Sequence, residues 1–355
     1  MNVGVLLGPA WRLARYVPGP VLGAAATLCA DVVWWRRPAG VRQLERNLAR
    51  VRPDASPADV RRLARDGMRS YLRYYAEAFT LASFTAAQTD ARVRTVGDAP
   101  LRAELAAGRS VVLALGHLGN WDLAGAYAAR AIGPVTTVAE RLEPEAAFRE
   151  FLAFREGIGL EIVPLDRSGG EVFRRLVRAV RGGGRLVPLL ADRDLTAHGV
   201  EVQMWGRTAR VAAGPAALAL STGVQLRPVT LHYERLDRTR RRAAGSPWGI
   251  VITFHDAVPV PATADRGHAV ATMTQAWVDV LCAGIGDHPQ DWHMLQKVFV
   301  EDLDPVRYAA TLARSGAGSS AGSSAGSSAG TGAGTAAGPS TAGGAADGAS
   351  GGASA

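Results

Sequence analysis

The chain has 355 residues, of which 48% are hydrophobic and 20% are charged, so most of it can bury a core. The formal net charge is +8, which suits an anionic membrane surface or phosphorylated ligands but is also explained by codon bias towards arginine in a GC-rich genome. Nucleic-acid binding is not expected, because no basic stretch carries interleaved aromatic residues. Two distant cysteines, Cys29 and Cys282, indicate neither a disulfide framework nor a structural zinc site, which suits a reducing cytoplasm.

Composition divides the chain into three parts. Residues 1–37 are mostly apolar and carry tryptophans beside arginines, which predicts helices lying on a membrane face. A signal peptide or a spanning helix is not expected there, whereas a helix packed in the core is the alternative. Residues 38–312 are predicted to form an α/β domain. Residues 313–355 are almost entirely Gly, Ala, Ser and Thr, which predicts a disordered tail because no large apolar side chain offsets the entropy of ordering it.

Taken in chain order, the predicted elements change from helices to an alternation of strands and helices. Ser56 and Pro57 are a plausible N-cap and first position for the second helix. Helices are predicted at residues 41–51, 59–84, 99–107, 120–132, 143–157, 171–181, 215–222 and 264–285. Strands are predicted at residues 92–96, 111–115, 134–138, 161–164, 186–191, 225–233 and 249–255. This alternation predicts an α/β fold with a central, mostly parallel or mixed sheet flanked by helices.

The segment most suggestive of chemistry is 116–122, which reads Gly-His-Leu-Gly-Asn-Trp-Asp and follows the apolar strand at 111–115. Ligand sites of open α/β sheets lie beyond the carboxyl ends of strands, so His117 is well placed for catalysis. Asn120 is expected to cap the next helix, with Asp122 in its first turn. From there Asp122 could fix the tautomer of the imidazole and leave the other ring nitrogen to accept a proton. A histidine with a purely structural role is the alternative.

Several further charged residues follow other predicted strands or lie near them, and they could line the same edge of the sheet. They are Glu140, Arg141, Arg155, Asp192, Arg193, Asp194 and Arg210. On the residues alone, surface ion pairs, exposed helix charges or a satisfied ion network are the alternatives. No serine or cysteine lies in a nucleophile elbow, so His117 is expected to activate a substrate hydroxyl directly. The other six histidines show no metal-ligand spacing and are expected to be structural.

The segment 116–122 resembles the His-x4-Asp motif of the lysophospholipid acyltransferase superfamily, specifically its lipid A late-acyltransferase branch. Four more segments agree with that branch: AERLEP at 139–144, FREGIG at 154–159, LADRD at 190–194 and AAGPA at 212–216. In this combination the sequence is similar to the phosphatidylinositol mannoside acyltransferases. The resemblance covers roughly residues 5–310, and the Gly/Ala/Ser/Thr tail lies outside it.

The resemblance implies that a long acyl group, such as palmitoyl, moves from acyl-coenzyme A to a mannose 6-hydroxyl of a phosphatidylinositol mannoside. His117 would deprotonate the hydroxyl, Asp122 would orient His117, and the charged residues named above would bind the substrates. In particular, Glu140 and Asp192 are expected to accept hydrogen bonds from sugar hydroxyls. The resemblance implies no metal or other cofactor. It implies a peripheral protein on the cytoplasmic face of the inner membrane, with an anionic membrane surface as a partner.

Two alternatives to this function stay open. One is a related acyltransferase that uses a lysophospholipid or another glycolipid as acceptor. The other is an inactive acyltransferase-like protein that binds lipids or scaffolds a membrane complex. A histidine and an aspartate retained at His-x4-Asp spacing favour an enzyme.

Overall fold

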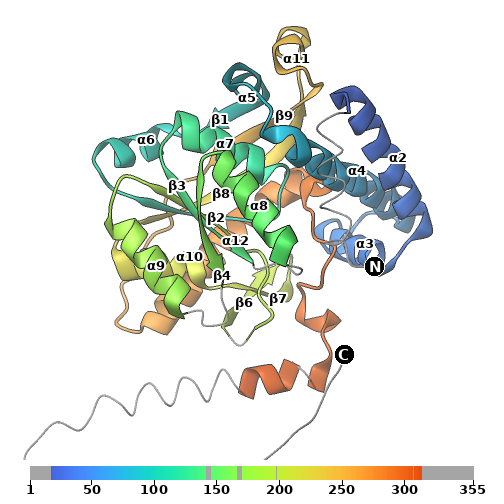
Figure 1. Ribbon diagram of the computed structural model, residues 1–355. Coiled ribbons are helices and arrows are strands. Elements are labelled where there is room, and N and C mark those ends of the chain that lie inside the picture. The colour runs from blue at the N-terminus through green and yellow to red at the C-terminus, as the bar shows by residue number, and fades with distance from the viewer. Residues whose placement is uncertain (1–16, 141–144, 166–169, 197, 307, 314–355) are drawn as a thin grey trace, which may run out of the picture.

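A computed structural model describes residues 17–313 apart from residues 141–144, 166–169, 197 and 307. The predicted tail, apart from its first residue, and the first apolar segment of the chain therefore lie outside the described residues. The described part is an α/β structure in which helices flank a central sheet (Figure 1).

The sheet has seven strands in the order β1-β9-β8-β2-β5-β3-β4. Every neighbouring pair is parallel except β8 and β9, which run antiparallel. The strands are β1 (Val93–Val96), β2 (Val111–Leu115), β3 (Val135–Glu140), β4 (Leu160–Leu165), β5 (Leu186–Leu190), β8 (Gln225–Arg235) and β9 (Trp248–Phe254). A separate antiparallel hairpin is formed by β6 (Gly199–Met204) and β7 (Arg207–Ala212). The predicted mostly parallel or mixed sheet is confirmed.

Helices cover both faces of this sheet. Right-handed connections between parallel strands place α7 and α8 on one face and α9 and α10 on the other, where α10 contacts both α9 and α12. The helices along the sheet are α5 (Ala86–Arg92), α6 (Ala99–Ala106), α7 (Trp121–Ala131), α8 (Glu145–Gly157), α9 (Gly170–Arg181), α10 (Gly214–Thr222), α11 (Arg238–Ala244) and α12 (Arg266–Asp287). Because both faces are covered, β2 is buried along its whole length, as its continuous apolar sequence predicts.

Three N-terminal helices form a second, smaller core beside the sheet. They are α2 (Gly19–Arg36), α3 (Ala39–Val51) and α4 (Pro57–Leu81). Figure 1 shows them together at one side of the molecule, away from α9. Ser56 caps α4 by accepting from the Asp59 N–H, as the sequence predicts. Arg50 joins α3 to the chain after the sheet, because its guanidinium donates to both oxygens of Asp302 at 2.8 Å.

Helix α2 is apolar on nearly every side, yet only Ala30 is buried. Val21, Leu28, Val32 and Trp35 recur at spacings that place them on one face of the helix, and all four are exposed. Asp31, the one acidic residue of α2, receives Arg65 and Arg69 from α4. Ala30, Val33 and Trp34 of α2 also pack into the small core, so an apolar strip and the Asp31 ion pairs together attach the helix. Among the described residues, the opposite apolar face of α2 is exposed.

Among the described residues, one helix is long and apolar enough to cross a membrane by length and composition, and it is α12. Its Trp277, Val278, Leu281 and Ile285 are buried, and the helix packs on β8 and on the β6 strand of the hairpin. These contacts are those of a core helix.

Candidate active site

His117 is held by Asp192 through two hydrogen bonds. Strands β2 and β5 are parallel neighbours, and Leu115 lies opposite Leu190 at their ends. His117 and Asp192 each lie two positions beyond these residues, so they come together. The imidazole Nδ1 lies 2.6 Å from Asp192 Oδ1, and the backbone N–H of His117 donates to Oδ2 at 2.9 Å. A carboxylate on Nδ1 fixes the proton there and leaves Nε2 as the basic nitrogen.

The two residues of this pair differ in their exposure to solvent. The Asp192 side chain is fully buried, whereas the His117 side chain is 39% exposed. The indole N–H of Trp292 donates to Asp192 Oδ2 at 3.0 Å, which fixes the carboxylate from a third direction. Gly116 is required for this close approach, because a Cβ there would lie 2.9 Å from Asp192 Oδ2. The imidazole is therefore accessible to solvent, whereas the carboxylate that holds it is not.

Electrostatics prepare His117 to accept a proton. Burial disfavours the imidazolium, but the charge and hydrogen bond of Asp192 outweigh it, so the pKa of His117 lies above its usual value of 6.5. Burial alone would raise the pKa of Asp192, but the opposing interactions with His117 hold it below its ordinary value. The pair is therefore a base whose protonated form is stabilised by a buried carboxylate.

Asp122 does not contact His117, and the expected His117–Asp122 hydrogen bond is wrong. Asn120 caps α7 by accepting from the Leu123 N–H at 2.9 Å, as predicted, and Asp122 follows in the first turn. There the Asp122 carboxylate accepts from the Tyr74 hydroxyl at 2.8 Å and from Arg155 Nε at 2.9 Å. The first turn of α7 faces α4 and α8, whereas the neighbour of His117 is the end of β5.

The Asp122–Arg155 ion pair is itself buried, with side-chain exposures of 1% and 9%. It connects to His117 through aromatic rings. Tyr74 lies against Trp121 with ring centroids 4.0 Å apart, and Trp121 meets the His117 ring edge-on at 5.4 Å. The aspartate of the His-x4-Asp motif therefore fixes the wall beside the histidine rather than the histidine itself.

The remaining predicted site residues are spread around this edge of the sheet. Arg193 Nε donates to the Lys297 carbonyl at 3.0 Å, and the Asp194 carboxylate accepts from the backbone N–H of Thr196. Arg210, almost fully buried, donates to the carbonyls of Thr196 and Gly199. These three side chains shape the loop between β5 and the hairpin.

For two further predicted site residues the structure gives little or no position. Glu140 is the last residue of β3, and Arg141 lies outside the described residues. Asp192 was expected at a sugar site, and that role is corrected by its three hydrogen bonds to His117 and Trp292.

Sequence reasoning missed the segment that follows α12. Trp292 supports Asp192, and the His293 backbone N–H donates to the His117 carbonyl at 2.8 Å. The His293 ring is buried, its Nε2 lies 2.9 Å from Ser70 Oγ, and burial lowers its pKa to about 3. His293 is therefore neutral and structural, as expected from the sequence. No local sequence pattern links residues 292–293 to His117, since the contact depends on where the chain runs after the end of α12.

The sequence matches the family of bacterial lipid A biosynthesis acyltransferases over residues 4–301. The chain therefore belongs to this family and is an acyltransferase. It is 40% identical over 304 residues to the phosphatidylinositol mannoside acyltransferase of Mycolicibacterium smegmatis, across 84% of this chain and 92% of that protein. Proteins of the same name from two strains of Mycobacterium tuberculosis are 40% identical over 290 residues, across 79% of this chain and 84% of theirs. The resemblance indicated by the sequence motifs is thereby confirmed.

Proposed function

We propose that this protein transfers a long acyl group, such as palmitoyl, from acyl-coenzyme A to a mannose 6-hydroxyl of a phosphatidylinositol mannoside. The observation that carries the proposal is the accessible His117 imidazole on the buried Asp192 carboxylate, in a chain 40% identical to relatives named for that acceptor.

In the proposed mechanism, His117 Nε2 removes the proton of the acceptor hydroxyl as its oxygen attacks the thioester carbonyl carbon. The carbon–oxygen bond forms, and the tetrahedral intermediate then expels the coenzyme A thiolate as the carbon–sulfur bond breaks. The imidazolium returns its proton to the thiolate. Asp192 stabilises the imidazolium while it exists, and Trp292 keeps the carboxylate aligned. Each step balances without a metal or another cofactor.

Charged residues around this centre have proposed roles in binding. Asp122 and Arg155 hold the aromatic wall of Tyr74 and Trp121 beside His117. We assign Glu140 and Arg141 to the sugar of the acceptor, because β3 ends at the same edge of the sheet as β2 and β5. Arg193, Asp194 and Arg210, in or beside the loop after β5, are assigned to the coenzyme A side.

The proposed setting is the cytoplasmic face of the inner membrane, with the protein bound peripherally. Support comes from α2, whose exposed Val21, Leu28, Val32 and Trp35 share one face. Apolar side chains beside arginines suit the boundary between headgroups and acyl chains. Residues 1–37 would then be the membrane-associating part, residues 38–312 the acyltransferase domain, and residues 313–355 a tail without a role in transfer.

The test is acyl transfer by purified protein from one acyl-coenzyme A to three acceptors: a phosphatidylinositol mannoside, a lysophospholipid and an unrelated glycolipid. Transfer to the mannolipid at least tenfold faster than to the others supports the proposal. Faster transfer to another acceptor overturns the substrate assignment. His117→Ala should abolish transfer, and His268→Ala, an exposed histidine in the first turn of α12, is the matched control. Full activity of folded His117→Ala protein would overturn the mechanism.

A further inference from the structure

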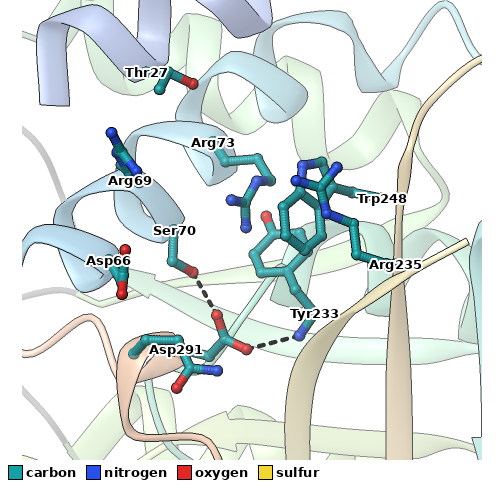
Figure 2. A pocket seen from close by; sticks show the side chains of 10 residues that line it. Thr27, Asp66, Arg69, Ser70, Arg73, Tyr233, Arg235, Trp248 and Asp291 are labelled. Atoms are coloured by element: carbon teal, nitrogen blue, oxygen red, sulfur yellow. Dashed lines mark hydrogen bonds between the residues drawn. The ribbon is translucent and has the colours of Figure 1, made fainter. Parts of the chain in front are cut away.

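A pocket of about 450 Å³ lies apart from the catalytic pair, where α2 and α4 meet the paired ends of β8 and β9 (Figure 2). Its lining combines three arginines, two aspartates, two aromatic rings and three neutral polar side chains. The residues are Thr27, Asp66, Arg69, Ser70, Arg73, Tyr233, Arg235, Trp248, Gln290 and Asp291. None of the residues of the sequence motifs or of the proposed acyl transfer lines this pocket.

Two of the arginines stack on one ring. The Arg73 guanidinium carbon lies 3.6 Å from the Trp248 ring centroid, and that of Arg235 lies 3.8 Å from it. Arg73 also lies over Tyr233 at 4.7 Å. Stacking uses the face of a guanidinium, so its in-plane N–H donors stay available to a ligand.

Neither of these guanidinium groups donates a hydrogen bond or lies within ion-pair distance of a carboxylate among the described residues. The other charges of the pocket are already engaged. Arg69 pairs with Asp31, and the Asp291 carboxylate accepts from the Ser70 hydroxyl at 2.6 Å and the Tyr233 N–H at 2.8 Å. The pocket therefore holds two unpaired cations that lie against the same indole.

Asp66 balances only part of this charge. Figure 2 shows it on the opposite side of the pocket from Trp248. The three arginines and two aspartates of the lining leave an excess of one positive charge, which matches the single negative charge of a phosphodiester. The pairing of Arg69 with Asp31 does not change this excess, because Asp31 is shared with a further arginine, Arg65. Asp66, Thr27 and Gln290 offer oxygen acceptors, which suit hydroxyl groups rather than a second phosphate. The polar groups thus fit a phosphodiester joined to a polyol.

The position of the pocket indicates where such a ligand comes from. Thr27 belongs to α2, whose exposed apolar residues Val21, Leu28, Val32 and Trp35 lie beside it along the same helix. A phospholipid can place its phosphate in the pocket while its acyl chains follow the apolar face of α2. A soluble phosphate compound makes no use of that face.

We propose that this pocket binds the headgroup of an inositol phospholipid. Arg73 and Arg235 donate hydrogen bonds to its phosphodiester, and the oxygen acceptors of the pocket bind the inositol hydroxyls. The proposal rests on the proposed function in placing the protein among lipids and in the choice of inositol as the polyol. It adds a phospholipid headgroup site to the acyl-transfer centre. The site acts on binding, and no proton or group transfer takes place there.

The first experiment measures calorimetric binding of glycerophosphoinositol to full-length protein without any acyl donor. We expect Arg73→Gln/Arg235→Gln to weaken binding by about tenfold or more, because each substitution removes charged hydrogen bonds to the phosphate. The matched control is Arg174→Gln/Arg178→Gln, which removes two exposed arginines of α9, far from the pocket. Unchanged binding in the first variant, or equal loss in both, would overturn the proposal.

Companion ligands identify the source of the phosphate. Inorganic phosphate and coenzyme A are titrated in the same way, and binding of either one as tight as glycerophosphoinositol would overturn the assignment to a lipid headgroup. Arg235 is exposed, so the single Arg235→Gln variant keeps the test decisive if the double variant fails to fold. Its binding should weaken at an unchanged melting temperature, and unchanged binding would count against the proposal.

A second experiment separates the acceptor from the surrounding bilayer. If the acceptor occupies the pocket, Arg235→Gln raises the KM for the mannolipid and leaves flotation with phosphatidylinositol vesicles unchanged. If a bilayer lipid occupies it, flotation falls and KM is constant at saturating vesicle concentration. A variant that matches the wild type in both measurements contradicts the proposal. Slow hydrolysis of acyl-coenzyme A, measured alongside, reports on the catalytic pair independently.

Discussion

Asp192 holds both the side chain and the backbone of His117, since one carboxylate oxygen meets the imidazole Nδ1 and the other accepts the peptide N–H. The imidazole therefore cannot turn without losing its partner, while the peptide contact keeps the carboxylate in place. Such double anchoring is what a general base needs in order to meet a hydroxyl in one fixed orientation.

Asp192→Asn should lower kcat by roughly 10²–10⁴-fold, because an amide neither stabilises the imidazolium nor dictates the same tautomer. The steady-state rate of acyl transfer measures this effect. Asp279→Asn, an exposed carboxylate of α12 that accepts from the Gln275 side chain, is the control and should keep its activity within a few-fold. Equal losses in the two variants would show a general effect of the substitution and not the loss of the partner of His117.

The activity of the wild type should rise with pH through the raised pKa of His117, because only the neutral imidazole accepts a proton. The midpoint of kcat/KM against pH should therefore lie above 6.5, the ordinary value for histidine. In Asp192→Asn protein the residual activity should show its midpoint at lower pH, since the attraction that raises the pKa is lost. An unchanged midpoint in this variant would show that Asp192 does not raise the pKa of the group that controls activity.

Trp292→Phe should reduce kcat by roughly ten- to a hundredfold with little change in KM, because it removes one charged hydrogen bond from the buried Asp192 carboxylate. A phenyl ring is smaller than the buried indole, so the substitution also loses some packing, and the control variant must carry the same loss of ring volume. Trp205→Phe is the control, as its ring packs against Trp292 at 5.6 Å. A change confined to KM would place Trp292 in substrate binding instead.

Asp122→Asn should affect stability first. The substitution leaves Arg155 as a buried cation without its carboxylate, which costs roughly 3–5 kcal/mol of unfolding free energy. Chemical denaturation measures that loss. Replacing both partners, as Asp122→Leu with Arg155→Met, should recover part of the stability, since no charge stays buried. A double variant less stable than either single one would contradict this account.

Leu28→Ser/Trp35→Ser should reduce flotation with anionic vesicles by about tenfold or more, because each side chain loses apolar area buried in the bilayer. Val260→Ser/Val306→Ser removes two exposed apolar side chains elsewhere and should change nothing. Flotation that withstands the first pair of substitutions would move the membrane contact away from α2.

The sheet and most helices could be predicted because their signals are local. The apolar run of β2, the Ser56 cap and the Asn120 cap are each readable within a few residues. The β6–β7 hairpin was missed, although Val200, Val202 and Met204 alternate with polar residues before a Trp205-Gly206 turn. Both turn residues have positive φ, and a tryptophan is an uncommon residue there, so the turn carried no clear signal.

The partner of His117 could not be predicted in the same way. Asp122 is near His117 in the sequence, but Asp192 is near it in space only because β5, and not β3, lies beside β2. Strand order depends on packing over the whole sheet. Trp292 reaches the site from still farther along the chain. Local spacing therefore located His117 and the edge of the sheet, whereas its contacts with Asp192 and Trp292 depend on long-range topology.

The separate contacts of Asp122 and Asp192 bear on how such enzymes are found by pattern. In this chain a search for a histidine and an aspartate five residues apart finds an aspartate that pairs with Arg155 and holds the start of α7. Asp192, the carboxylate that contacts the imidazole, lies 75 positions after the histidine, outside any short pattern. A protein that keeps the short motif but loses the distant carboxylate would be counted as an enzyme while lacking the partner of its base.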